Sequence, residues 1–285
     1  MNRASKGHPR SARLKWKLRG WFGSLLLAAL AFAFVVPILW MLTTSFQAGE
    51  KMYELSTVWI PSAWHFENYP NALQRSPFAQ YFLNSGIVAV TVMVTNVVFC
   101  TIAGYGLAKF RFPGDRYVLL LILATLMLPL EVTLVPTFLV IHEFGWLNTY
   151  QGLAGPFLID AFGIFLMRQS MLSIPADYIE AARMDGAGEL RILLQIIVPQ
   201  CLPALAVLAV FSFRDNWDQF LWPLTVVSRD EFRTFPLGLV RFAEDYGSPP
   251  TEQLSIAVLA TIPTVLLFVI LQRAVNRGFG LSGLK

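Results

Sequence analysis

Residues Ile174–Pro203 read IPADYIEAARMDGAGELRILLQIIVPQCLP, the one polar, acidic stretch between long apolar runs. Pro175 suits the first turn of a helix, because the N–H that proline lacks would be unpaired there anyway. Glu180 lies near the same end, where the helix dipole favours negative charge. Asp185-Gly186 is expected to end this helix, since glycine tolerates turn conformations that other residues avoid. The stretch predicts a helix and a turn, followed by a second helix.

The second helix is predicted from its apolar spacing. Positions i, i+3, i+4 and i+7 lie on one face of a helix, and here they are occupied by Leu190, Leu193, Leu194 and Ile197. The first helix carries the small residues Ala181 and Ala182, which would let another surface approach closely.

Composition places the chain in a membrane. Of its 285 residues, 55% are hydrophobic and only 14% are charged, whereas soluble domains carry about a quarter charged residues. The net charge of +4 does not indicate a nucleic-acid partner, because seven Lys and Arg residues fall within the first nineteen positions. Such a cluster is typical of a cytoplasmic flank beside anionic lipid. The two cysteines imply neither a disulfide framework nor a zinc site.

Six segments are long and apolar enough to cross a bilayer, whose core of about 30 Å needs about 20 helical residues. We therefore expect an all-α, polytopic membrane protein with six transmembrane helices. Prolines inside these segments suggest kinks or tight packing. The predicted spans are Trp21–Phe46, Phe82–Lys109, Tyr117–Ile141, Gly152–Met171, Val198–Leu221 and Leu254–Val275.

The orientation follows from the basic residues in the loops, which accumulate on the cytoplasmic side. With the N-terminus inside, the inner segments hold sixteen Lys and Arg residues and the outer loops hold five. Both termini and the Ile174–Pro203 stretch are therefore expected to be cytoplasmic.

Several polar residues fall within the predicted spans, where they are costly and commonly line a cavity or pathway. Counting the helical rise places them in the outer half of the bilayer, and we expect them to face a shared cavity. Alternatively, Arg214 and Asp218 neutralise each other, and Glu131 serves packing. Asn84, Thr91 and Thr95 could extend the polar face or join helices by hydrogen bonds. The expected pathway residues are Glu131, Asp160, Arg214, Asp215, Asn216 and Asp218.

The Ile174–Pro203 stretch resembles the EAA loop of bacterial ABC-importer permeases. In that family this loop is a cytoplasmic coupling helix that docks on the ATPase subunit. The alternative is a solvated connector that binds nothing. The resemblance rests on Glu180-Ala181-Ala182, Asp185-Gly186-Ala187, Ile197-Val198-Pro199 and Pro203, and the first six of these residues are the expected docking residues.

Phe213–Leu224 resembles the carbohydrate-type permeases of this superfamily, the maltose-like and glycerol-3-phosphate-like inner-membrane subunits. Those usually show Trp-Asn, an acidic residue and an aromatic, whereas this chain has Trp217-Asp218-Gln219-Phe220. Trp217 and Phe220 are further pathway candidates, able to stack on a sugar face or to pack in the core. Similarity at Gly145–Thr149, Phe235–Leu239 and the C-terminal tail extends over most of the chain.

The resemblance implies a permease subunit that is not itself an enzyme and holds no cofactor or metal. Its partners would be ATP-binding subunits, a second permease expected to be a different chain, and an external solute-binding protein. No P-loop occurs, so a partner must bind ATP. The domains expected are a basic cytoplasmic segment at 1–20, the six-helix domain at 21–276 with its coupling loop at 174–197, and a cytoplasmic tail at 277–285.

The predicted function is therefore a permease in the bacterial cytoplasmic membrane that carries a carbohydrate or related polar solute. The alternatives are an importer for peptides or anions, a proton-coupled transporter using Glu131 or Asp160, and a membrane enzyme acting on lipid.

Overall fold

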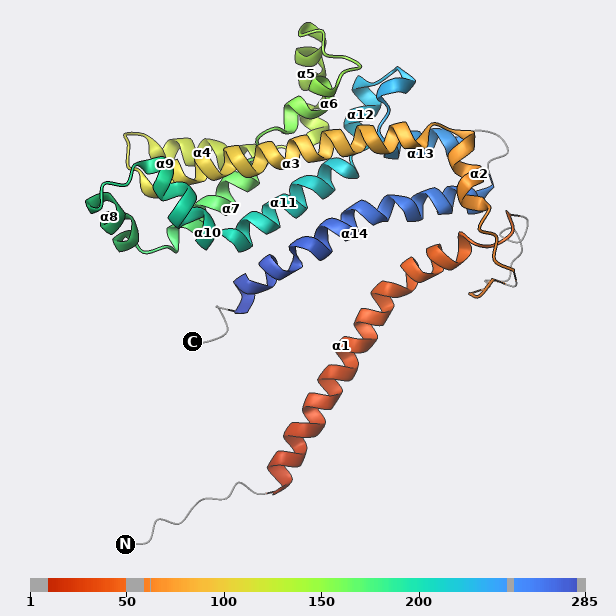
Figure 1. Ribbon diagram of the computed structural model, residues 1–285, viewed down its shortest axis with the longest axis horizontal. Coiled ribbons are helices and arrows are strands. Elements are labelled where there is room, and N and C mark those ends of the chain that lie inside the picture. The colour runs from red at the N-terminus through yellow and green to blue at the C-terminus, as the bar shows by residue number, and fades with distance from the viewer. Residues whose placement is uncertain (1–9, 50–58, 62, 245–248, 281–285) are drawn as a thin grey trace. The chain divides into compact units, whose positions relative to one another are not determined.

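The computed structural model describes residues 10–49, 59–61, 63–244 and 249–280, and helices are the only regular structure in these ranges (Figure 1). The chain divides into two compact units. Unit 1 comprises Met1–Ala72 and Pro249–Val258, and unit 2 comprises Leu73–Ser248 and Leu259–Lys285. The prediction of an all-α, polytopic chain is confirmed.

Unit 1 is built on α1 (Arg10–Thr44). Most described side chains of α1 are exposed apolar groups, as expected of a helix that faces lipid or another protein. Just beyond its end, the ring of Phe46 lies 5.1–5.4 Å, between centroids, from the rings of Trp64, Phe66 and Tyr69.

Unit 2 is organised around α3 (Phe78–Lys109), which packs most extensively against α7 (Ala161–Leu172) and α11 (Leu202–Trp217) (Figure 1). A glycine permits the closest approach. A Cβ atom added at Gly104 would lie 2.8 Å from the Cβ of Met167, closer than two such atoms can pack. The sequence of α3 therefore allows α7 to lie directly against its backbone.

Three continuous helical stretches are long and apolar enough to cross a membrane: Gly23–Thr44, Phe78–Lys109 and Pro250–Val275. They match the first, second and sixth predicted spans, although the second begins at Phe78 rather than Phe82. The last belongs to α14 (Pro250–Gly280). Three bent helix pairs would bring the number of spans to six if each pair forms one span.

The third predicted span, Tyr117–Ile141, is not one continuous helix. It consists of α4 (Asp115–Thr125) and α5 (Leu130–Glu143), whose axes differ by 101°. Pro129 precedes α5 in an extended conformation, as the residue before a helix often is. The depth estimated for Glu131 assumed a straight helix and does not hold.

The fourth and fifth predicted spans are also broken. Tyr150–Phe157 meets α7 at 44°, and Glu189–Gln200 meets α11 at 83°. Pro203 lies in the first turn of α11, where its missing N–H costs no hydrogen bond. The fifth span therefore starts a new helix at Leu202 instead of continuing from Val198.

The predicted terminal segments are only partly described. Residues 1–9 and 281–285 lie outside the described residues, while α1 already begins at Arg10 and α14 continues to Gly280. The short elements are α2 (Asn68–Arg75), α6 (Tyr150–Ala154), η2 (Gly155–Phe157), α8 (Ala176–Met184), α9 (Glu189–Ile192), η3 (Leu193–Ile197), α10 (Val198–Gln200), α12 (Leu221–Val226), η4 (Asp230–Phe232) and α13 (Phe235–Glu244).

Candidate functional site

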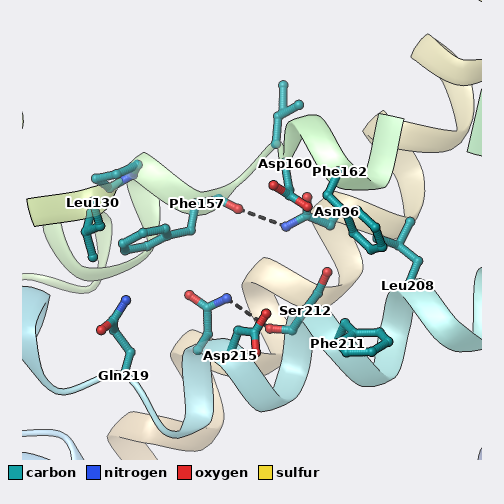
Figure 2. Close-up of a pocket in the computed structure, with 13 residues that line it drawn as sticks. Asn96, Leu130, Phe157, Asp160, Phe162, Leu208, Phe211, Ser212, Asp215 and Gln219 are labelled. Atoms are coloured by element: carbon teal, nitrogen blue, oxygen red, sulfur yellow. Dashed lines mark hydrogen bonds between the residues drawn. The ribbon is translucent and has the colours of Figure 1, made fainter. Parts of the chain in front are cut away.

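A cavity of about 400 Å³ lies within unit 2, between α3, the segment that joins η2 to α7, the start of α5 and α11 (Figure 2). Three aromatic rings line it, those of Phe157, Phe162 and Phe211. Its polar lining consists of Asn96, Asp160, Ser212, Asp215, Asn216 and Gln219.

Asp160 stands where the fourth predicted span is broken. It precedes α7 as its N-cap, and its Oδ2 accepts a hydrogen bond from the backbone N–H of Gly163 at 3.0 Å. This side chain satisfies one of the N–H groups that a helix start leaves unpaired. Asp160 therefore stabilises the start of α7 while its half-buried side chain lines the cavity.

Asn96 holds the other side of the same break. Its amide Nδ2 donates to the carbonyl oxygens of Phe157 at 2.8 Å and Val92 at 3.0 Å. Its Oδ1 accepts from Sγ of Cys100 at 3.3 Å. A buried asparagine whose amide N and O are both paired fixes the backbone at the end of η2, next to the break before α7. Asn96 was not among the residues predicted from the sequence, although an amide within an apolar helix is a signal for such a role.

One face of α11 and the residues after it supplies the rest of the polar lining. Ser212, Asp215, Asn216 and Gln219 follow the i, i+3, i+4, i+7 spacing of a helical face. Asn216 donates from Nδ2 to the carbonyl oxygen of Ser212 at 2.9 Å. This periodicity was present in the sequence, yet the predicted set combined residues from several faces.

Arg214 and Asp218 lie on the adjacent face of α11 and do not line the cavity. The Arg214 guanidinium lies 3.7 Å from Oδ2 of Asp218 and 3.5 Å from Oδ1 of Asp215. The contact between Arg214 and Asp218 agrees with the alternative hypothesis that these two residues neutralise each other.

Trp217 lies in the apolar core of unit 2 and Phe220 is half-buried, and neither belongs to the cavity lining. Trp217 is 3% exposed, stacks on Phe213 with ring centroids 5.7 Å apart, and donates from Nε1 to the carbonyl oxygen of Ala260 at 3.0 Å. Phe220 packs against a second buried cluster. Glu131 is exposed in the first turn of α5, and its neighbour Leu130 lines the cavity instead.

Asn84 was expected either to extend the polar face or to join helices by hydrogen bonds. In the structure its amide joins elements within unit 2. Its Nδ2 donates to the carbonyl oxygens of Glu231 and Arg233, each at 2.8 Å. Its Oδ1 accepts from Oη of Tyr150 at 2.7 Å and Nε2 of Gln80 at 2.9 Å.

The predicted turn after α8 has the geometry of a Schellman motif. Gly186 has φ +79°, its N–H bonds the carbonyl oxygen of Arg183, and the N–H of Ala187 bonds that of Ala182, both at 3.0 Å. This pair of bonds closes a helix at a left-handed glycine. Glu180, Ala181, Asp185 and Gly186 are exposed, while Ala182 and Ala187 are half-buried against the core.

The apolar face predicted for the following helix is partly wrong. Ile192, Leu193 and Ile197 are buried, whereas Leu190 and Leu194 are 69% and 55% exposed. From Leu193 onward the spacing is changed by the π-helical stretch η3, in which the N–H of residue 198 bonds the carbonyl oxygen of Leu193. A wider turn moves later residues around the helix axis and changes which of them face the core.

A polar network fastens this segment to α3. Tyr105 donates from Oη to Oε2 of Glu189 at 2.6 Å, and Glu189 accepts at Oε1 from Nε of Arg183 at 2.8 Å. That hydrogen bond raises the pKa of Arg183 above its usual value. Lys109, at the end of α3, donates from Nζ to the carbonyl oxygen of Ile174 at 2.7 Å. We call Tyr105, Glu189 and Arg183 the α8 clamp.

The apolar helices, the polar cavity and the capped α8 segment together define a membrane permease. The chain belongs to the family described as binding-protein-dependent transport system inner membrane component, whose profile matches residues 97–280. It is thus a multi-pass inner-membrane permease subunit of an ABC importer, and not an enzyme. Among the described residues, no group of three or more His, Cys, Asp or Glu side chains could hold a metal ion.

Several curated relatives match over much of their length. The arabinooligosaccharides transport system permease protein AraQ of Halalkalibacterium halodurans is 29% identical, over 93% of this chain and 96% of its own. The diacetylchitobiose uptake system permease protein NgcG of Streptomyces coelicolor is 33% identical, over 85% of this chain and 81% of its own. The sn-glycerol-3-phosphate transport system permease protein UgpE of Brucella abortus is 36% identical, over 68% and 70%.

A solved structure shares the fold. It is a crystal structure of a bacterial ABC transporter involved in the import of the acidic polysaccharide alginate. The matching chain is 26% identical with a TM-score of 0.80, over 94% of this chain and 99% of that one. The family predicted from the EAA-like loop is confirmed.

Proposed function

We propose that this chain forms part of the membrane pathway for a carbohydrate or a related polar solute. The relatives named for arabinooligosaccharides and diacetylchitobiose support this solute class. The cavity supports it too, because amide, hydroxyl and carboxylate groups beside aromatic rings suit a ligand with many hydroxyls and apolar ring faces.

The observation that carries the proposed mechanism is α8, a capped and largely exposed helix between two membrane segments. Ile179 buries its side chain in the core at 4% exposure, while Glu180 on the next position is exposed. One side of α8 is therefore held by unit 2 and the other is free to dock. We assign docking on the ATP-binding subunit to the exposed Glu180, Ala181, Asp185 and Gly186, together with the half-buried Ala182 and Ala187.

The remaining partners follow from this assignment. Two permease subunits, this chain and a second one expected to differ from it, would enclose the pathway, and an external binding protein would deliver the solute. Both termini and α8 would lie on the cytoplasmic side, in agreement with the excess of Lys and Arg in those segments. In this arrangement, ATP-driven closure of the partner subunits moves α8 and, through the α8 clamp, α3.

The test is Glu180→Lys in the complete complex reconstituted into proteoliposomes with its binding protein. Uptake of radiolabelled arabinooligosaccharide, diacetylchitobiose and glycerol 3-phosphate is measured with and without ATP. We expect ATP-dependent uptake of one sugar by the native complex, and loss of uptake in the variant while membrane insertion persists.

The matched control is Glu143→Lys, which reverses an exposed charge at the far end of α5 and should leave uptake unchanged. Normal transport by Glu180→Lys would refute the docking role. ATP-dependent uptake of none of the three probes, with uptake of a peptide instead, would refute the solute class.

A further inference from the structure

The charged side chains that line the cavity are all acidic among the described residues. Two carboxylates line it, Asp160 at the start of α7 and Asp215 on α11, and they lie on facing elements (Figure 2). The other polar groups of the lining are neutral amides and a hydroxyl. No Lys, Arg or His side chain belongs to the lining formed by the described residues.

Arg214, a cation on α11 beside the cavity, is already engaged by carboxylates. Arg214 contacts Asp215 at 3.5 Å and Asp218 at 3.7 Å, and it is not part of the lining. Arg214 thus contacts two carboxylates and Asp160 adds a third, so the described residues in this region carry an excess of negative charge. A cavity lining with a net negative charge attracts cations and repels anions, most strongly where little water screens the charges.

We propose that this cavity discriminates by charge, admitting neutral polyhydroxylated solutes and rejecting anionic ones. The inference rests on the proposed function and narrows its solute class. Carboxylates and amide oxygens accept hydrogen bonds from solute hydroxyls, whereas a phosphate or carboxylate on the solute would face acceptors of its own charge. Asp160 and Asp215 are the residues that determine this specificity. The anionic solutes in the names of some relatives are therefore disfavoured here.

The expected selectivity follows from the size of the cavity. A volume of about 400 Å³ corresponds to a sphere roughly 9 Å across, so an occupant lies within about that distance of each carboxylate. At an effective dielectric constant of about 20, one like charge at this range lowers occupancy roughly 20-fold. The guanidinium of Arg214 offsets part of the effect, so we expect at least about a tenfold preference.

The experiment measures the cavity potential without knowledge of the solute. Gln219→Cys places a thiol in the lining of the full chain, in a background where the buried Cys100 and Cys201 are replaced by alanine. In the complete complex, its labelling rates are compared for methanethiosulfonate reagents carrying a trimethylammonium or a sulfonate group. Each rate is divided by that of a free thiol, and an exposed Ser173→Cys serves as the reference position.

We expect the cationic reagent to be favoured at least tenfold at position 219 and not at position 173. Adding Asp160→Asn with Asp215→Asn should abolish most of that preference, and asparagine remains a good N-cap for α7. Equal or faster labelling by the anionic reagent, or a preference unchanged in the double variant, would overturn the proposal.

These outcomes do not depend on ATP or on α8, so they are distinguishable from a failure of the proposed function. For a transported neutral sugar, the double variant should also raise uptake of its carboxylated analogue about tenfold relative to uptake of the neutral sugar. No gain for the carboxylated analogue would count against the proposal.

Discussion

Replacing Tyr105 by phenylalanine removes one hydroxyl and tests how α8 is attached to α3. Tyr105 is 5% exposed, and its Oη donates a hydrogen bond to Oε2 of Glu189 at 2.6 Å. A hydrogen bond to a charged group contributes about 1.5–3 kcal/mol. Because the Glu189 side chain is 43% exposed, water competes for it, and the lower value of about 1.5 kcal/mol is appropriate. This free energy corresponds to about a tenfold change in an equilibrium constant.

The assay is hydrogen–deuterium exchange of the purified complex, followed on the peptide that contains α8. If α8 exchanges by detaching from α3, Tyr105→Phe should accelerate its exchange about tenfold. Arg183→Gln should have a smaller effect, because exposed ion pairs contribute little. The matched control is Tyr150→Phe, whose hydroxyl bonds Asn84 elsewhere in unit 2. Equal exchange of α8 in Tyr105→Phe and the native protein would refute the clamp.

Three further predictions concern stability, measured as the thermal midpoint of the complex in detergent. Gly186→Ala should lower it, since a non-glycine residue at φ +79° costs about 1–2 kcal/mol, whereas Gly188→Ala at φ −72° should change it less. Gly163→Val should lower the free energy of unfolding by about 1–3 kcal/mol, because even a Cβ atom there would lie 2.8 Å from the side chain of Leu208 on α11. The control Gly106→Val has open space around it and should lower that free energy less. Asn96→Leu should cost about 1–3 kcal/mol by leaving a backbone carbonyl unpaired, and a midpoint equal to that of the native protein would contradict this.

Helix content, the membrane class and the α8 turn were predictable from local sequence, because each depends on composition or on short-range geometry. Apolar length alone indicates a span, and Asp185-Gly186 marks the end of α8 by the conformational freedom of glycine. The family resemblance also came from one stretch of sequence, Glu180 to Pro203, in which the spacing of the matching residues can be recognised without knowledge of the fold.

The bends and the cavity were harder to predict, because they depend on contacts between distant residues. The 101° angle between α4 and α5 cannot be read from Pro129 or Pro136, since a proline permits a break without setting its angle. Trp217 was assigned to the pathway by its neighbours in sequence, but the ring of Phe213 and the carbonyl oxygen of Ala260 hold it in the core.

The brevity of α8 has a consequence for how it can act. A helix of nine residues is too short to persist alone in water, so α8 keeps its shape only while its glycine end, Ile179 and the clamp hold it. A synthetic peptide of the α8 sequence should be a random coil, and it should compete poorly with the intact permease for the ATP-binding subunit. A force applied to α8 must therefore either move the neighbouring spans with it or unfold it. The stability of α8 thus sets an upper limit on the force that it can transmit to the spans.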